Sequence, residues 1–177
     1  MKKVLFTHSY FLRFDPKQWK MQQPYLPLGT ISAAAYLRNK NYQIELFDTM
    51  FAHSADEIIP ELEKFQPEFL VIYDDGFNYL TKMCLTNMRE AAFEMIRFAQ
   101  ARKIKVIVNS SDSTDHAEKY LSVGADFIIV GEGEETLGEL IDHLSNSDDA
   151  PIEIPGLQYK STDGLVKTPK RNVLKTI

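Results

Sequence analysis

The sequence predicts an α/β fold in which one doubly wound sheet holds five parallel strands in the order 2-1-3-4-5, followed by a small C-terminal β-hairpin. Five short apolar runs rich in β-branched residues lie at residues 3–8, 43–48, 68–73, 103–109 and 126–130. Such runs are typical of strands buried on both faces. Segments with a helical spacing of apolar residues separate them. Because crossovers are right-handed, few topologies remain, and this Rossmann-like (flavodoxin-like) order is the one we expect.

After each strand, apolar residues recur every three or four positions, as on one face of a helix. We expect helices at about residues 30–39, 54–66, 79–102, 115–122 and 134–144. Pro60 fits poorly inside the second of these helices, which should therefore kink or start late. Gly124 ends the fourth helix in the usual C-terminal position.

Residues 9–23 form a long irregular segment between the first strand and the first helix. A loop of this length in a compact domain is usually functional or disordered. This one carries large side chains, which argue against disorder: Tyr10, Phe11, Leu12, Phe14 and Trp19. We therefore expect a functional segment here.

The composition changes after Leu144. Residues 145–151 have the polar composition of a linker, and the Asp163-Gly164 turn between two apolar runs predicts the hairpin. We expect one domain over residues 1–145. Residues 146–177 should form a linker, a hairpin and a basic exit segment that leads toward a further domain.

The composition argues against several classes of protein and of binding site. The 177 residues carry a net charge of −5, whereas a dedicated nucleic-acid binder normally has a basic face. Apolar runs are shorter than the roughly 20 residues that a membrane span needs. Cys84 is the single cysteine, so this chain cannot itself form a disulfide or a multi-cysteine metal or iron–sulfur site. We expect a cytoplasmic protein.

Polar residues follow the predicted strands. The carboxyl ends of parallel strands meet at one edge of a sheet, where open α/β folds bind ligands. The residues expected at that edge are His8, Asp48, Asp74, Asp75, Asn78, Asn109, Ser110, Ser111, Thr114 and Glu132. As a ring they favour a binding cleft.

The turn after the fifth strand is the strongest single signal. Gly131 and Gly133 break the apolar run, and a helix restarts with Glu134, Glu135 and Thr136. Free backbone N–H groups at a helix start can bind an anion or a polar ligand. Acidic residues also suit a helix N-terminus without any ligand, because they complement the helix dipole. Both interpretations remain open from these residues alone.

Four better-known sites fit poorly. A phosphoacceptor domain has an acidic pair after strand one and a lysine after strand five. This chain has neither, so Asp74-Asp75 does not fit such a site. The offset between Asp48 and His53 matches no metal-ligand spacing. A flavin-phosphate loop needs small residues, but residues 9–23 contain no glycine. The dinucleotide fingerprint lacks its third glycine.

Three segments together resemble one family. They are Pro27-Leu-Gly-Thr-Ile-Ser-Ala-Ala-Ala-Tyr-Leu-Arg38 with Ile44-Glu-Leu-Phe-Asp48, Ala125-Asp-Phe-Ile-Ile-Val-Gly-Glu-Gly-Glu-Glu-Thr-Leu137, and the exit hairpin with Ile154-Pro-Gly-Leu-Gln-Tyr-Lys160 and Thr168-Pro-Lys-Arg171. They are similar to the N-terminal cobalamin-binding domain of radical SAM enzymes. That group includes the anaerobic magnesium-protoporphyrin IX monomethyl ester oxidative cyclase and cobalamin-dependent methyltransferases.

The resemblance implies that cobalamin lies over the carboxyl edge of the sheet. The residues that would line it are Gly131, Glu132, Gly133, Glu134 and Thr136, with Asp74, Asp75, Gly76 and Asn78 beside them, Asn109, Ser110 and Ser111 along the nucleotide tail, and Thr7 at the end of strand one. The aromatic Tyr10–Trp19 loop would cover the corrin ring or face the radical SAM barrel.

Two positions depart from the family pattern. The Asp-x-His-x-x-Gly signature of cobalt-ligating domains is absent, which implies that no protein histidine lies below the cobalt. After strand four the family often has Gly-Gly, but this chain has Asn109-Ser110-Ser111. Side chains there could hydrogen-bond a ligand or block it.

The resemblance also implies a larger enzyme. A [4Fe–4S] cluster and S-adenosylmethionine are expected only in a radical SAM barrel of the same polypeptide, C-terminal to Ile177. This chain would bind and not catalyse. The alternative is a cofactor-free domain that docks on that barrel or positions its substrate.

Overall fold

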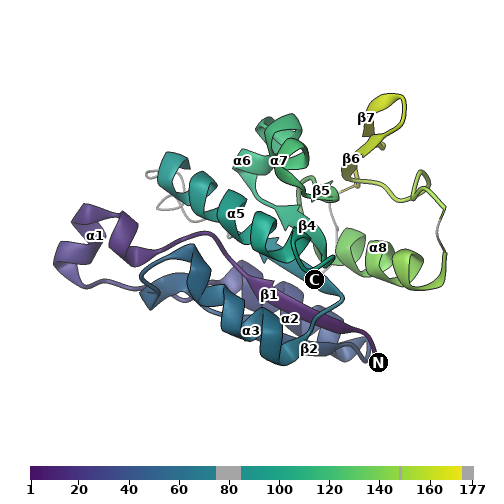
Figure 1. Ribbon diagram of the computed structural model, residues 1–177. Coiled ribbons are helices and arrows are strands. Elements are labelled where there is room, and N and C mark those ends of the chain that lie inside the picture. Colours follow the sequence, from purple (N-terminus) through teal and green to yellow (C-terminus); the bar gives the residue numbers. More distant parts are fainter. Residues whose placement is uncertain (75–84, 148, 173–177) are drawn as a thin grey trace.

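The computed structural model describes residues 1–74, 85–147 and 149–172, and its strands form one seven-stranded sheet in the order β2-β1-β3-β4-β5-β6-β7 (Figure 1). The parallel strands are β1 (Lys3–Thr7), β2 (Gln43–Phe47), β3 (Phe69–Tyr73), β4 (Lys105–Asn109) and β5 (Phe127–Ile129). The antiparallel strands are β6 (Leu157–Ser161) and β7 (Gly164–Lys167).

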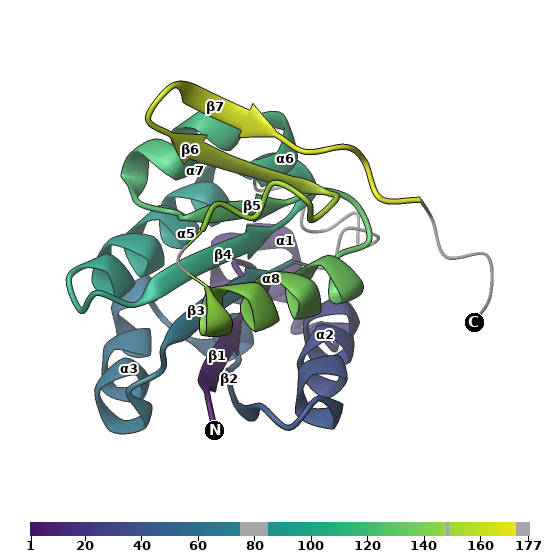
Figure 2. The ribbon, with the colours of Figure 1, turned by 90° about the vertical axis from the view of Figure 1, so that its right-hand side faces the viewer.

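The prediction of a five-stranded sheet with a separate hairpin was wrong. The parallel strands keep the relative order 2-1-3-4-5, but β6 pairs with β5, with Ile128 opposite Gln158. The hairpin therefore extends the sheet (Figure 2). Without it, β5 would be an edge strand with a row of unpaired backbone groups, a feature that proteins commonly cover.

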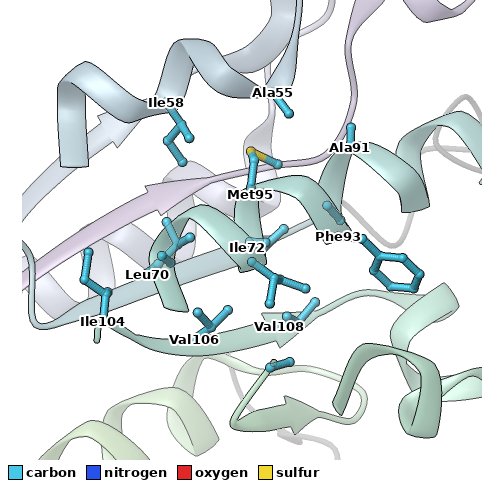
Figure 3. Close-up of a cluster of buried hydrophobic side chains, with 14 of the residues drawn as sticks. Ala55, Ile58, Leu70, Ile72, Ala91, Phe93, Met95, Ile104, Val106 and Val108 are labelled. Carbon is cyan, nitrogen blue, oxygen red and sulfur yellow. The ribbon is translucent and has the colours of Figure 1, made fainter. Parts of the chain in front are cut away.

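Helices cover both faces of the sheet (Figure 2). Helices α2 (Leu28–Asn39) and α8 (Glu134–Asn146) pack on one face, in an apolar cluster with alternate residues of the strands. The other face carries α3 (Ile59–Phe65), α5 (Leu85–Gln100) and α7 (Ala117–Val123). Figure 3 shows part of that second core, where Leu70 and Ile72 of β3 face Met95 of α5.

One predicted helix is divided in the structure, and another is preceded by a short helix that was not predicted. Residues 55–65 start as a 3-10 turn, η3 (Ala55–Ile58), and become α-helical at Ile59, with Pro60 in the first turn. Proline is tolerated there because the first N–H groups of a helix have no intrahelical acceptor. Residues 111–123 form α6 (Ser111–Asp115) and α7, which meet at His116.

The segment after β1 is folded into the core. It contains η1 (Leu12–Phe14) and α1 (Pro16–Met21), and it packs beside η2 (Thr49–Phe51), which follows β2. Tyr10, Phe11 and Leu12 are each 0% exposed. The expectation that these three side chains cover a cofactor or face another domain was therefore wrong, because they already pack in this chain's own interior.

Among the described residues, no helix is both long and apolar enough to span a membrane.

Candidate functional site

The turn after β5 lies at the carboxyl edge of the sheet. Helix α8 begins at Glu134, directly after the turn, and Gly133 is its N-cap residue. Gly131 has a φ of 82°, in the left-handed region that favours glycine, and no atom lies within 4 Å of the position a Cβ would take there. The outer side of the turn at Gly131 is therefore open.

The inner side of the same turn is filled. Asn109 Nδ2, at the end of β4, donates to the carbonyl oxygens of Ile129 at 3.2 Å and of Gly131 at 3.1 Å. The Gly133 N–H donates to the hydroxyl oxygen of Tyr73, at the end of β3, at 3.2 Å. A Cβ on Gly133 would lie 3.0 Å from the Asn109 amide nitrogen, the Tyr73 hydroxyl and Ile129 Cγ2. No free space remains there.

The Tyr73 hydroxyl stays protonated in this setting. Tyr73 is 4% exposed, and burial raises the pKa of its hydroxyl well above the usual range, with the nearby carboxylate of Glu134 raising it further. A protonated phenol can accept from the Gly133 N–H without placing a buried negative charge beside Glu134.

The exit segment, which we define as residues 168–172 after β7, lies against the start of α8. Arg171 Nε donates to Thr136 Oγ1 at 2.8 Å, and its terminal nitrogens reach Glu135, at 3.1 Å, and Glu139. Thr136 Oγ1 in turn donates to the carbonyl oxygen of Pro155 at 3.0 Å. The hydroxyl of Thr136, a predicted site residue, is thus used inside the chain.

The turn and the exit segment enclose a cavity of about 250 Å³. Its lining residues are Val130, Gly131, Glu132, Glu134, Glu135, Lys170, Arg171 and Asn172. The lining holds carboxylates, which accept hydrogen bonds, and the cationic Lys170 and Arg171, which donate them, so the cavity offers partners to both donor and acceptor groups. Pockets that bury a drug-sized ligand are roughly 300–1,000 Å³, so a larger molecule could enter only in part.

Asp74 anchors the segment after β1 to the end of β3. Its two carboxylate oxygens accept from the backbone N–H of Ser9 at 2.7 Å and from the Ser9 hydroxyl at 2.8 Å. Burial raises the pKa of Asp74, although both Ser9 hydrogen bonds favour its charged form. Asp75, Gly76 and Asn78, the neighbouring predicted site residues, lie outside the described residues, as does Cys84.

The residues after β4 mainly support local structure. Ser110 caps α6, since its Oγ accepts from the Ser113 N–H at 2.8 Å in a capping box. Ser111 is exposed at the start of that helix, and Thr7 is fully buried. The carboxyl edge of the sheet is therefore where it was predicted, but most of the polar groups described along it already have hydrogen-bond partners in the chain.

A buried histidine, His8, pairs with Asp48 at the other end of this edge. His8, 1% exposed, contacts Asp48 Oδ1 through Nε2 at 2.8 Å, and Thr49 Oγ1 lies 3.1 Å from its Nδ1. The His8 hydrogen bond holds the pKa of Asp48 below its usual value. Within residues 1–74, 85–147 and 149–172, no three histidine, cysteine or carboxylate side chains gather as a metal site.

Sequence reasoning missed Tyr73, Ser9 and Arg171. Tyr73 ends a fully buried strand, and a buried tyrosine hydroxyl normally finds a partner, so its position was a usable signal. Ser9 and Arg171 carried no comparable signal, because their partners lie 65 and 35 positions away in the chain.

The fold matches solved structures over nearly the whole chain. One is a radical S-adenosylmethionine methyltransferase, TsrM from Kitasatospora setae, solved with its tryptophan substrate and a SAM analogue. It aligns with a TM-score of 0.71 at 18% sequence identity, and the alignment covers 96% of this chain and 30% of the TsrM chain. The structure of TsrM with cobalamin and a [4Fe–4S] cluster aligns with a TM-score of 0.68 at 19% identity, covering 100% of this chain and 30% of the TsrM chain.

A second enzyme shares the fold. OxsB, a cobalamin-dependent S-adenosylmethionine radical enzyme solved with aqua-cobalamin and S-adenosylmethionine, aligns with a TM-score of 0.70 at 19% identity, covering 98% of this chain and 23% of its own. This chain thus spans about a quarter of the length of these structures. No family model and no curated protein matches the sequence.

Proposed function

We propose that this chain is the cobalamin-binding module of a larger radical SAM enzyme of the oxidative cyclase or methyltransferase type. The observation that carries the proposal is the near-complete overlap of its fold with parts of TsrM and OxsB, both solved with a cobalamin bound. The Gly131–Thr136 turn lies at the carboxyl edge of the sheet, where open α/β folds hold ligands.

The outer side of the turn fits part of a corrinoid. Gly131 leaves room for close approach of a ligand to the backbone, and Glu132 is exposed beside it. The corrin ring carries amide side chains, whose N–H groups would donate to Glu132 and Glu134. Asp74, Asp75, Gly76 and Asn78 would flank the ring. When bound, cobalamin supplies cobalt chemistry, and the residues of this chain would bind and orient it.

The cavity is too small to enclose a whole cobalamin. We infer that the opposite face of the ring is covered by a radical SAM barrel of the same polypeptide, which would carry the [4Fe–4S] cluster and S-adenosylmethionine. Residues 1–145 would then hold the cofactor, and residues 146–177 would lead to the barrel. Arg171 supports this arrangement, because it ties the exit segment to the start of α8.

A titration of the purified chain with hydroxocobalamin tests the proposal. The visible spectrum should shift on binding, and the cofactor should co-elute with the protein in gel filtration. Glu132→Gln keeps the shape of the side chain and removes its charge, so it should weaken binding severalfold. Glu94→Gln, an exposed carboxylate of α5 on the opposite face of the sheet from α8, is the matched control and should leave binding unchanged. Absence of co-elution at high micromolar cofactor would refute binding by this chain.

A second candidate is a cofactor-free domain that docks on the barrel. The filled inner side of the turn favours it, since Tyr73 and Asn109 leave no slot there for a ligand. Leu26, Leu28 and Phe51, all more than half exposed, lie in segments after β1 and β2 at the same edge and could pack on another domain. This candidate predicts no co-elution of cobalamin even with a longer chain that includes the barrel.

A further inference from the structure

We infer that the exit segment is one wall of the ligand site and that Arg171 is the residue that positions this wall. A ligand and the exit segment would then bind to the start of α8 cooperatively, so that binding of the ligand fixes the part of the chain that leaves the sheet. The inference rests on the proposed function and adds to it how occupancy of the site affects the segment that follows.

The cavity beside the turn has two walls that come from distant parts of the chain. One wall is the end of β5 with the start of α8, from Val130 to Glu135. The other wall is Lys170, Arg171 and Asn172 of the exit segment. A ligand that fills the cavity touches both walls, so part of its contacts exist only while the exit segment is docked against α8.

Arg171 holds the second wall in place. The exit segment is first fastened at Pro169, whose carbonyl accepts from the Gly156 N–H at 2.7 Å. In the part of the chain that the structure describes, the hydrogen bonds made beyond Pro169 are those of Arg171, which include Thr136 at 2.8 Å and Glu135 at 3.1 Å. The Arg171 contacts therefore determine whether residues 170–172 line the cavity or leave it open.

Docking also changes the charge that a ligand meets. The first wall carries the carboxylates of Glu132, Glu134 and Glu135, and the second wall brings the cations of Lys170 and Arg171 beside them. Without these cations a ligand would have to desolvate three carboxylates that nothing offsets, which is costly. With both walls present, most of the exposed surface inside the cavity is apolar, and burying it favours binding.

Such coupling is reciprocal. If a ligand binds mainly to the docked form, it lowers the undocked population by one plus the ratio of the free ligand concentration to the dissociation constant. At ten times the dissociation constant this factor is about 11. In the other direction, a variant that is partly undocked binds more weakly, because the apparent affinity falls with the fraction of chains that are competent to bind.

Hydrogen exchange with and without hydroxocobalamin tests the inference on the 177-residue chain. The Gly156 N–H is protected by the Pro169 carbonyl, so it exchanges when the exit segment undocks. At ten times the dissociation constant, its exchange should slow about tenfold. The Glu68 N–H donates to the carbonyl of Lys3 at 2.9 Å at the opposite edge of the sheet. It is the control, and its exchange should change less than about twofold.

Arg171→Ala gives the reverse measurement. It should weaken hydroxocobalamin binding about fivefold, since the docked fraction falls. Arg171→Lys keeps the charge, but one ammonium cannot replace a guanidinium that contacts a hydroxyl and two carboxylates, so its affinity should lie between the two. Arg102→Ala is the matched control, because Arg102 pairs with Glu63 away from the turn, and it should bind as the unmodified chain does. Circular dichroism shows whether each variant is folded.

The outcomes separate the two proposals. If hydroxocobalamin binds and leaves the Gly156 exchange unchanged, or slows Gly156 and Glu68 equally, the inference is overturned while the proposed function stands. A folded Arg171→Ala variant with unmodified affinity overturns it as well. If the unmodified chain binds no hydroxocobalamin, the proposed function fails for this chain and the inference fails with it. Slower exchange at Gly156 alone, together with weaker binding by Arg171→Ala, supports both.

Discussion

Replacing Arg171 with alanine should release the exit segment from the start of α8. The Arg171 side chain is 17% exposed, and it donates to Thr136 at 2.8 Å and to Glu135 at 3.1 Å, besides its pair with Glu139. A hydrogen bond from a charged donor contributes about 1.5 kcal/mol. The two carboxylates are 37% and 46% exposed, so solvent screening leaves the ion pairs about 0.5 kcal/mol together. The local loss is therefore about 2 kcal/mol.

Amide hydrogen exchange at Gly156 measures that loss directly. Its N–H donates to the carbonyl of Pro169 at 2.7 Å, so it is protected only while the exit segment stays in place. A loss of about 2 kcal/mol corresponds to exchange about 30-fold faster in Arg171→Ala. Arg102→Ala is the matched control, because Arg102 pairs with Glu63, which is 63% exposed, and its removal should change the Gly156 rate less than about twofold.

An unchanged Gly156 rate in Arg171→Ala would refute this reasoning. It would mean that the pairing of β6 and β7, and not Arg171, holds the segment in place. Equal acceleration in both variants would point to a general loss of stability, which a urea titration of each variant would reveal as a lowered midpoint.

Three further predictions concern the same edge. Burial raises the folded-state pKa of Asp74, so its ionisation opposes folding and stability should fall as pH rises from about 4 through that raised pKa. Asp74→Asn should remove this pH dependence, which urea titrations at several pH values would detect; an unchanged slope would refute it. Gly131→Ala places a side chain at a φ of 82° in open space, so it should cost about 1 kcal/mol from backbone strain alone. Gly133→Ala should cost more, because its Cβ would meet three atoms at 3.0 Å, and equal midpoints for the two variants would contradict this. Tyr73→Phe leaves the buried Gly133 N–H without an acceptor and should cost about 1–2 kcal/mol in the same titration, and a loss within error of zero would argue against that hydrogen bond.

The periodicity of the sequence was sufficient to predict the parallel strands and the two helical layers. Runs such as residues 68–73 are apolar throughout because β3 is buried on both faces, and that burial is what the pattern reports. The strand count was not predictable in the same way. A hairpin of residues 157–167 looks the same in sequence whether it stands alone or pairs with β5, because pairing depends on the free edge of another strand.

The location of the candidate site was predictable from the sequence, but which of its polar groups are already hydrogen-bonded within the chain was not. Asn109 and Thr136 follow the right strands, and the structure places both next to the turn. Their polar groups are bonded to carbonyl oxygens of distant segments, however, and no local pattern reveals such partners. The prediction for the segment after β1 failed for a related reason. Aromatic residues suggest a cover for a ligand, but they are equally common in a core, and Tyr10 and Phe11 lie in the core of this chain.

The hairpin also decides the direction in which the chain leaves the sheet. Strand β6 reverses the direction of β5, and β7 reverses it again, so β7 runs the same way as the parallel strands. Two reversals, an even number, return residues 168–172 to the edge that carries the Gly131–Gly133 turn. A single added strand would have sent them to the opposite edge, a full strand length away. The parity of the antiparallel strands thus brings the exit and the candidate site to the same side of the molecule.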